Sequence, residues 1–440
     1  QCNSGTRIFA SSPQLPFTGT LNPPENTMYR PPKQLLLALV ALLLAATTAG
    51  ADDTASLDGW PEWVHKAMNA EVKRLKYRDV TTPDESVRAS LPGKPQDPEP
   101  MEGGWYFAAD MKADSPLECY LYTSSMDLAT LIDVVAEANL AAVAGSPDNI
   151  GNRRIYHTSA GAVAGMPYLG LEWLYTVQSD GQMMVGFTKV RAAAKGDHAL
   201  LCSHNYIGYR DTFARAFTEF VTNTQFDDGT PAPFYEEIAE VDMNSLGSGV
   251  AYTSFTTDED GDIRMYSAEA SLIPVDAATL TTSDSYTISF TAPEGTLLRA
   301  YSIGVENGEL AVNMDLGRND EGTWVSSGML QGKELAFDID GSLEPTSEWT
   351  QLAQARSLFT GDATSVDALI WMPSIDPTQF LEARRTRDDA EVERQATVTL
   401  GPLSYTGRFD TSGNMENADM AIGPVSIRIE RTWSTGSLLQ

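Results

Sequence analysis

Apolar residues between positions 104 and 227 follow strand-like and helix-like spacings in turn. Residues 117–122 alternate apolar and polar side chains, which is typical of a strand with one buried face. After Asp127 the apolar residues recur every three or four positions, which predicts a helix that Asp127 caps and Gly145 ends. A second helix is expected after Gly208. This stretch predicts one sheet with helices on one face, whose further strands are expected at 105–107, 153–159, 169–178, 182–190 and 198–204.

Beyond residue 248 the chain consists mainly of short alternating segments joined by acidic or glycine-containing turns. About ten such strands predict an antiparallel barrel, half-barrel or sandwich. Short helices are expected at 349–359 and 376–385. The whole chain is therefore expected to be α+β, with an α/β sandwich on an antiparallel sheet followed by a mostly antiparallel β half-barrel or barrel. The expected strands lie at 249–256, 262–273, 285–291, 298–306, 309–316, 322–330, 334–340, 394–400, 403–410 and 424–433.

Residues 28–51 have the three-part pattern of a secretory signal peptide. The basic residues Arg30 and Lys33 precede an apolar run at 35–46, and Ala49-Gly50-Ala51 is a small-x-small cleavage site. The apolar run is shorter than the roughly 20 residues that a membrane span needs. We therefore expect cleavage near Ala51 and no integral membrane span afterwards. The mature protein is expected in the periplasm or outside a bacterial-type cell.

Changes in composition divide the rest of the chain. Five prolines between residues 79 and 103 indicate a linker or extended arm, and the Asp-, Gly- and Pro-rich segment 227–233 indicates a domain boundary. Residues 1–27 are expected to be upstream sequence absent from the natural protein. The other expected segments are a helix and Pro-rich linker at 52–103, the α/β sandwich at 104–227, a linker at 228–248 and the β-rich domain at 249–440.

Acidic residues outnumber basic residues by two to one. The chain has 60 Asp and Glu against 30 Lys and Arg, which gives a formal net charge of −30. These charges are spread along the chain, and no basic cluster stands out. Nucleic acid and anionic membrane surfaces are therefore not expected as partners.

Cys119 and Cys202 lie in two predicted strands of the same sheet. In an oxidising compartment they can form one disulfide, with two free thiols as the alternative. His198, Cys202 and His204 fall on one face of a strand and are zinc-ligand types, but structural zinc needs four ligands and no second cluster exists. A Cys202–His204 nucleophile pair would need a third, orienting group that the sequence does not show.

Two further motif-like segments have ordinary explanations. The acidic turn around Gly261 resembles a calcium loop, but Thr256 and Ser267 stand where such a loop has Asp and Glu, so a hairpin turn is expected. The glycine-rich segment 161–165 lacks the Lys-Ser/Thr ending of a phosphate loop. No catalytic residue, metal or cofactor is assigned.

Two parts of the chain resemble known families. Leu200-Leu201-Cys202-Ser203-His204, followed by 208–213 and Phe217, is similar to the closing strand and helix of PsbP-like α/β/α sandwich domains, which implies a scaffolding or binding role without a shared catalytic set. Residues 285–433 resemble the glycolipid-binding half-barrel family, which implies a half-barrel shape. The matching features are Gly322-Thr323-Trp324, Asp338-Ile339-Asp340 and Trp371-Met372-Pro373.

Tryptophan and methionine recur in the β-rich part. Most are expected in a core, whereas some are expected to line an apolar cavity between the sheet and crossing helices, where they suit adaptable apolar ligands. The sequence does not identify which residues bind a ligand. The residues in question are Trp324, Trp349, Trp371, Trp433, Met314, Met329, Met372, Met415 and Met420.

Three functions follow as hypotheses. The first is an exported, non-enzymatic binding or carrier module that holds an apolar, amphipathic or glycolipid-like ligand in its β-rich domain. The alternative is a structural or interaction protein that docks to a periplasmic or cell-surface complex. The third is a hydrolase whose site cannot be read from the sequence.

Overall fold

The structure is a computed structural model that describes residue 57 and residues 59–124, 127–179, 181–226, 232–244, 246–388, 393–401, 403–422 and 425–438. Over these ranges the chain is α+β and mostly β, with two large antiparallel sheets. The expected signal peptide at 28–51 and the segment 1–27 lie outside the described residues. No helix within the described ranges is both long and apolar enough to cross a bilayer.

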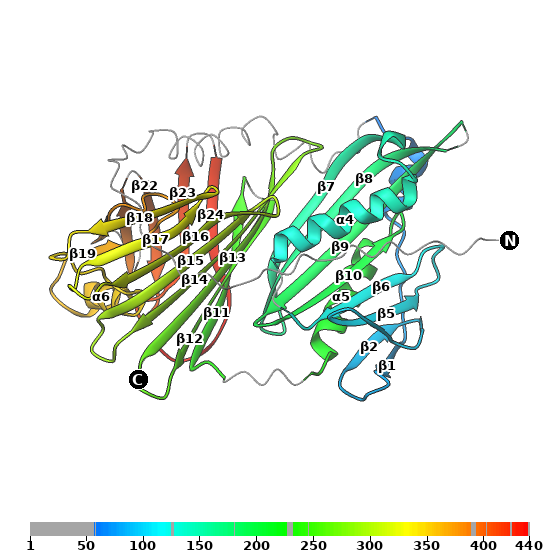
Figure 1. The fold of residues 1–440 in the computed structure, drawn as a ribbon. Coiled ribbons are helices and arrows are strands. Elements are labelled where there is room, and N and C mark those ends of the chain that lie inside the picture. Colours follow the sequence, from blue (N-terminus) through cyan, green and yellow to red (C-terminus); the bar gives the residue numbers. More distant parts are fainter. Residues whose placement is uncertain are drawn as a thin grey trace.

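Eight strands form the first sheet, in the order β3-β5-β6-β10-β9-β8-β7 with β4 beside β5. Figure 1 shows β5 to β10 side by side. Every neighbouring pair is antiparallel. A hairpin of β1 (Tyr77–Thr81) and β2 (Arg88–Pro92) forms a separate two-stranded sheet. The strands of the first sheet are β3 (Lys94–Pro95), β4 (Glu99–Met101), β5 (Gly104–Asp110), β6 (Leu117–Tyr122), β7 (Ile150–Val163), β8 (Met166–Ser179), β9 (Gln182–Lys195) and β10 (His198–Asn205).

Helices cover both faces of the first sheet. α4 (Leu128–Ala144) packs on the face that contains Leu201, and α5 (Arg210–Asn223) packs on the opposite face, which contains Leu200. The expectation of helices on one face was wrong because residues 199–204 of β10 are buried without alternation, and each apolar face of a sheet needs a cover. The short α3 (Glu62–Met68) packs beside β8 and β9.

Fourteen strands form the second sheet, and β18 and β19 are its two edges. The sheet curls into an open half-barrel that is not closed into a barrel (Figure 1). Its order is β18-β17-β16-β15-β14-β13-β12-β11-β24-β23-β22-β21-β20-β19. The strands are β11 (Tyr235–Met243), β12 (Leu246–Thr257), β13 (Ile263–Pro274), β14 (Leu280–Thr291), β15 (Leu297–Glu306), β16 (Glu309–Arg318), β17 (Trp324–Leu330), β18 (Lys333–Ile339), β19 (Ser365–Ile370), β20 (Leu381–Arg387), β21 (Gln395–Leu400), β22 (Leu403–Phe409), β23 (Met415–Ile422) and β24 (Val425–Gly436).

α6 (Glu348–Thr360) lies within the curl of the second sheet. Ser347 caps it, since the Ser347 hydroxyl accepts a hydrogen bond from the backbone N–H of Thr350 at 3.2 Å. On one side Leu352 contacts buried residues of β12 and β13, and on the other Ala355 contacts buried residues of β21 and β22. The helix therefore bridges parts of the sheet that are far apart in strand order.

Three segments differ from their expected structure. The Pro-rich segment 52–103 also contains β1 to β4, and its prolines fit because β3 and β4 are very short strands at the sheet edge. The expected linker 228–248 contains β11, whose glutamates hide the apolar alternation. Residues 376–385, expected to be helical, end in β20, which the pairing with β19 and β21 holds in an extended conformation.

The two sheets pack against each other through α4 and the outer face of β11 to β14. The Asp284 carboxylate, in β14, accepts hydrogen bonds from the backbone N–H groups of Ala129 at 2.8 Å and Thr130 at 3.0 Å. Asp284 therefore caps α4 from the other sheet. The expected cap, Asp127, makes no capping hydrogen bond with its side chain, which instead accepts one from the Tyr286 hydroxyl at 2.9 Å.

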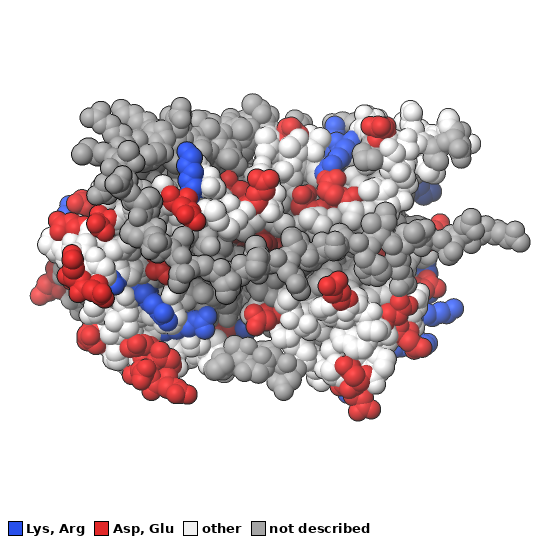
Figure 2. Space-filling view, viewed as in Figure 1, with Lys and Arg blue, Asp and Glu red and all other residues white. Residues whose placement is uncertain are grey.

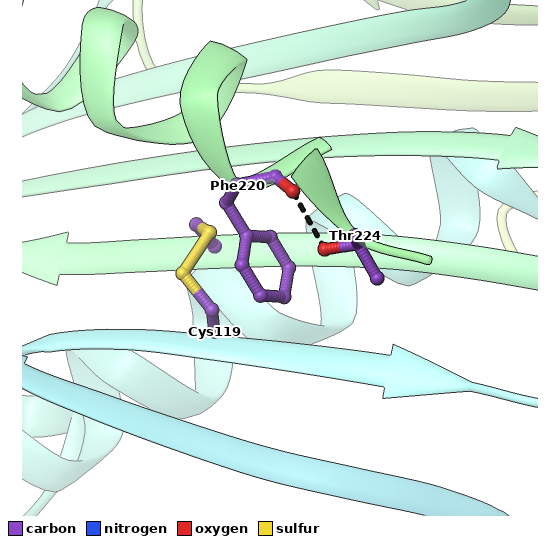
Figure 3. The surroundings of a disulfide bond; sticks show 4 residues. Cys119, Phe220 and Thr224 are labelled. Atoms are coloured by element: carbon purple, nitrogen blue, oxygen red, sulfur yellow. Dashed lines mark hydrogen bonds between the residues drawn. A yellow bond between two sulfur atoms is a disulfide. The ribbon is translucent and has the colours of Figure 1, made fainter. Parts of the chain in front are cut away.

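Cys119 and Cys202 form a disulfide between directly paired positions of β6 and β10. The bond lies on the α5 face of the first sheet beside the ring of Phe220 (Figure 3). Both cysteines are fully buried, and the bond joins positions that are 83 residues apart. It therefore links two neighbouring strands near the centre of the first sheet that are far apart along the chain.

We expect replacement of both cysteines by alanine (Cys119→Ala, Cys202→Ala) to lower the free energy of unfolding by about 2–4 kcal/mol, because the unfolded chain regains the freedom that the closed loop removes. Urea unfolding followed by tryptophan fluorescence measures the loss. Wild-type protein unfolded with a thiol reductant should show a similar loss. Equal unfolding midpoints in all three samples would contradict the prediction.

Asp284 should make stability fall as pH rises. Burial raises the pKa of Asp284 to about 6, although its hydrogen bonds to Ala129 and Thr130 oppose that shift. Between about pH 4 and pH 6 the folded chain therefore holds more protons than the unfolded chain, so folding is favoured at the lower pH. We expect the unfolding free energy of wild type, relative to Asp284→Asn, to decrease across this interval.

Chemical unfolding of both proteins at stepped pH checks this expectation. Asp340→Asn is the control, because hydrogen bonds from Ser342 lower the pKa of Asp340. The contribution of Asp340 should stay level between pH 4 and pH 6 and decline only at lower pH. If the difference in unfolding free energy between wild type and Asp284→Asn is constant or grows with pH, the pKa of Asp284 is not raised in the folded protein.

Candidate functional site

A cavity of about 350 Å³ lies between the concave face of the second sheet and α6. Its volume falls within the range of small-molecule sites, roughly 300–1,000 Å³. Most of its surface is apolar, although nearly half of its lining residues carry polar or charged groups. We call this cavity the lumen. Its main apolar lining residues are Phe255, Met265, Trp371, Met372, Phe409 and Met415.

A row of small hydroxyl side chains forms one wall of the lumen. Thr253 pairs with Ser267, and Ser267 pairs with Thr287, across β12, β13 and β14. The Thr253 and Ser267 hydroxyl oxygens lie 3.3 Å apart. Tyrosines precede these residues in each strand and lie on the opposite face, where they contact each other between the sheets. The small inner side chains leave space where large ones would fill it.

Glu237 also lines the lumen, and its charge is compensated. Its Oε2 lies 3.6 Å from Nη1 of Arg431 and accepts a hydrogen bond from the Tyr235 hydroxyl at 2.9 Å. Arg431 pairs more closely with Asp410, at 2.8 Å. The Asn414 amide donates a further hydrogen bond to Glu237. Burial raises the pKa of Glu237, whereas Tyr235, Arg431 and Asn414 lower it.

Glu348, at the start of α6, is the second lumen carboxylate. Its Oε2 accepts a hydrogen bond from the Ser289 hydroxyl at 2.7 Å, and burial raises its pKa. The first turn of a helix favours a negative charge, because the N-terminal N–H groups point toward it. Glu348 is therefore accommodated by α6 itself.

Arg385, in β20, is the cation that lines the lumen, and it donates its hydrogen bond to a neutral partner. Its Nη2 donates to Oε1 of Gln351 at 2.7 Å. Among the described residues, no Asp or Glu oxygen lies within 4.0 Å of the Arg385 guanidinium. Burial lowers the pKa of Arg385, and the phenol of Tyr405 is the ionisable group that opposes the shift.

The histidine and cysteine candidates do not form one site. His198 stacks on Phe226 with ring centres 4.3 Å apart. His204 is buried, its Nε2 lies 3.2 Å from the Ser115 carbonyl oxygen, and burial lowers its pKa to about 3. The Cys202 sulfur is bonded to Cys119 and so is not a free nucleophile. No group of three potential metal ligands occurs within the described ranges.

The two other motif-like segments form turns. The Asp258 carboxylate accepts hydrogen bonds from the backbone N–H groups of Asp260 and Asp262, and Gly261 has a φ of 87°, so this segment is a hairpin turn between β12 and β13. Residues 161–165 end β7, turn and lead into β8.

The tryptophans and methionines divide between core and lumen. Trp371, Met372 and Met415 line the lumen. Trp324 and Met314 lie in a core near the β18 edge, and Trp371 belongs to this core as well. The hydroxyl row and Arg385 were not singled out from the sequence. A repeated pattern could have identified the row, because each of four neighbouring strands contains Tyr followed by Ser or Thr, at 252–253, 266–267, 286–287 and 301–302.

Comparisons with known proteins show weak likeness in fold. No family model and no curated protein matches the chain. A beta-barrel-like protein of the domain of unknown function DUF1849 from Brucella abortus is 13% identical with a TM-score of 0.37, over 46% of this chain and 96% of that one. Cyanobacterial PsbP from Synechocystis is 12% identical with a TM-score of 0.25, over 36% and 96% of the two chains. A DUF1089 family protein from Pseudomonas aeruginosa is 13% identical with a TM-score of 0.20, over 42% and 89%. These likenesses assign neither ligand nor activity.

Substitution of the two inner arginines by methionine should have opposite consequences. Arg431→Met leaves Glu237 and Asp410 without their cation, so we expect a loss of about 3 kcal/mol in the free energy of unfolding. Arg385→Met removes a charge that no carboxylate compensates, so we expect stability no lower than that of wild type. Urea unfolding without added ligand compares the two. A loss for Arg385→Met as large as that for Arg431→Met would contradict this assignment of partners.

Proposed function

We propose that the protein is an exported, non-enzymatic carrier that holds an apolar or amphipathic ligand, such as a glycolipid-like molecule, in the lumen of the second sheet. The lumen itself carries this proposal. It combines a mostly apolar surface with polar and charged side chains that can orient a ligand, and small-molecule sites usually contain both kinds of group. Each methylene group of a ligand that leaves water for such a surface contributes about 0.8 kcal/mol.

The composition of the lining supports a ligand with a flexible apolar chain. Met265, Met372 and Met415 have unbranched, polarisable side chains that adapt to irregular shapes. Phe255 and Trp371 supply broad, rigid surfaces beside them. The lining is therefore suited to a family of related apolar chains rather than to one rigid molecule.

Export is the second part of the proposal. It is motivated by the leader pattern at 28–51 and is compatible with the Cys119–Cys202 disulfide, because disulfides persist in oxidising compartments. The interaction-protein alternative has the same compartment but needs no ligand. The two differ in whether purified protein contains a small molecule.

Organic extraction and native mass spectrometry of the purified chain test the carrier. We expect the purified protein to contain a bound amphiphile whose mass can be measured. After delipidation, we expect the protein to take up an added fatty acid. A chain that contains no small molecule and takes up none, but is recovered with a stable protein partner, would favour the interaction protein and reject the carrier.

A large side chain in the hydroxyl row should close the lumen. Ser267→Trp places an indole between Thr253 and Thr287, so we expect ligand uptake to fall at least about tenfold, which corresponds to about 1.4 kcal/mol. Ser404→Trp is the matched control, because Ser404 is exposed. Titration of delipidated protein with a fluorescent fatty acid measures both variants. If both variants lose fatty-acid binding equally, the ligand binds elsewhere. The same conclusion follows if Ser267→Trp keeps its fold, by circular dichroism, and binds the fatty acid as tightly as wild type.

A further inference from the structure

Arg385 is a partly buried cation whose hydrogen-bond partner carries no charge. Its guanidinium projects from β20 into the lumen and reaches α6 through one hydrogen bond, to the neutral amide oxygen of Gln351 at 2.7 Å. A buried charge without an opposite charge is unfavourable, and such groups are normally paired. The arrangement therefore calls for an anion in the space beside the guanidinium.

The carboxylates of the lumen do not supply that anion. Glu237 is held by Arg431 and Asn414, and Glu348 is held by Ser289 at the start of α6. Neither lies within 4.0 Å of Arg385, and no other carboxylate of the described residues does. The neighbouring Arg384 shows the contrast, because its side chain is exposed and pairs with Asp367 at 2.6 Å.

The surroundings of Arg385 combine polar and apolar groups at one place. Tyr405 follows Arg385 in the same row of the sheet, through Val398 of β21. Trp371 and Met372 line the same cavity with an apolar surface. An amphipathic molecule whose headgroup contacts Arg385 can therefore extend its chain over apolar side chains without leaving the lumen.

We propose that Arg385 binds the anionic headgroup, a carboxylate or a phosphate, of a single-headed amphiphile whose apolar chain occupies the lumen. This inference rests on the proposed carrier function and specifies its ligand class. Guanidinium groups form paired hydrogen bonds with both carboxylate and phosphate oxygens, so the two headgroups share one chemistry.

The outer surface carries mostly charge of the opposite sign to Arg385. Asp and Glu side chains are spread over the face seen in Figure 2, with fewer Lys and Arg among them, and the chain has a formal net charge of −30. Such a surface disfavours adsorption of anions on the outside. Arg385 therefore offers an anionic amphiphile a contact that this acidic face does not favour.

Calorimetric titration of the delipidated full chain tests the inference with four probes. Dodecanoate and dodecyl phosphate are used below their micellar concentrations, uncharged dodecanol is used below its solubility limit, and inorganic phosphate is the headgroup alone. We expect wild type to bind the two anionic amphiphiles at least about tenfold more tightly than dodecanol. Arg385→Gln should weaken binding of the anionic amphiphiles about tenfold and leave dodecanol binding unchanged. Arg385→Lys, which keeps the charge but not the planar fork, should lie between the two.

Arg384→Gln is the matched control, because it removes the adjacent arginine, whose side chain is exposed. The Arg384→Gln protein should bind all four probes like wild type. Two results would show that Arg385 does not bind the headgroup: dodecanol binding as tightly as dodecanoate, or Arg385→Gln binding every probe like wild type. Either result would leave the proposed carrier function intact. If no amphiphile binds wild type, the carrier itself fails. Inorganic phosphate binding as tightly as dodecyl phosphate would support an anion site at Arg385 and overturn the amphiphile.

Discussion

Strands β11 to β14 have to bury both of their faces, and the other features of the second sheet follow from this constraint. Their outer face packs on α4 and the first sheet, where Ile238, Val250 and Leu272 join the shared core. Their inner face looks toward α6 and the lumen. Because successive side chains of a strand point to opposite sides, these strands carry two independent patterns in one sequence. The outer pattern joins the two sheets, and the inner pattern leaves the lumen open.

The contact between the sheets is polar as well as apolar. Asp284 belongs to the second sheet but satisfies the first N–H groups of α4, which covers the first sheet. Helix ends leave such groups without partners inside the helix, so a cap from another element makes the two units depend on each other. Glu236 adds a second link, because it pairs with Lys195 of β9 at 2.6 Å. We infer that the wall of the lumen is held in place by the first sheet, although no described residue of the first sheet lines the lumen.

The sequence predicted the local structure better than the arrangement in space. Strands with clear alternation, such as β16 and β24, and the helices α4 and α6 could be recognised from spacing alone. β11 could not, because its glutamates look solvent-exposed until Lys195 and Arg431 meet them from distant parts of the chain. The prediction that the Asp127 side chain caps α4 failed for the same reason, because the capping carboxylate comes from a distant part of the chain. Asp127 is the nearest acidic residue in sequence, but Asp284 is the one that reaches the helix end.

The lumen shows why the site residues were less predictable than the fold. Arg385 and Arg431 are both arginines in strands of the second sheet, each directly after another charged residue, and nothing local separates them. Their partners do: Arg431 meets Asp410 and Glu237 across the sheet, whereas Arg385 meets the amide of Gln351. A protein that needed Arg385 only for stability would gain by placing a carboxylate beside it or an apolar residue in its place. Retention of an uncompensated cation in an apolar lumen is therefore best explained by a ligand that brings the missing charge.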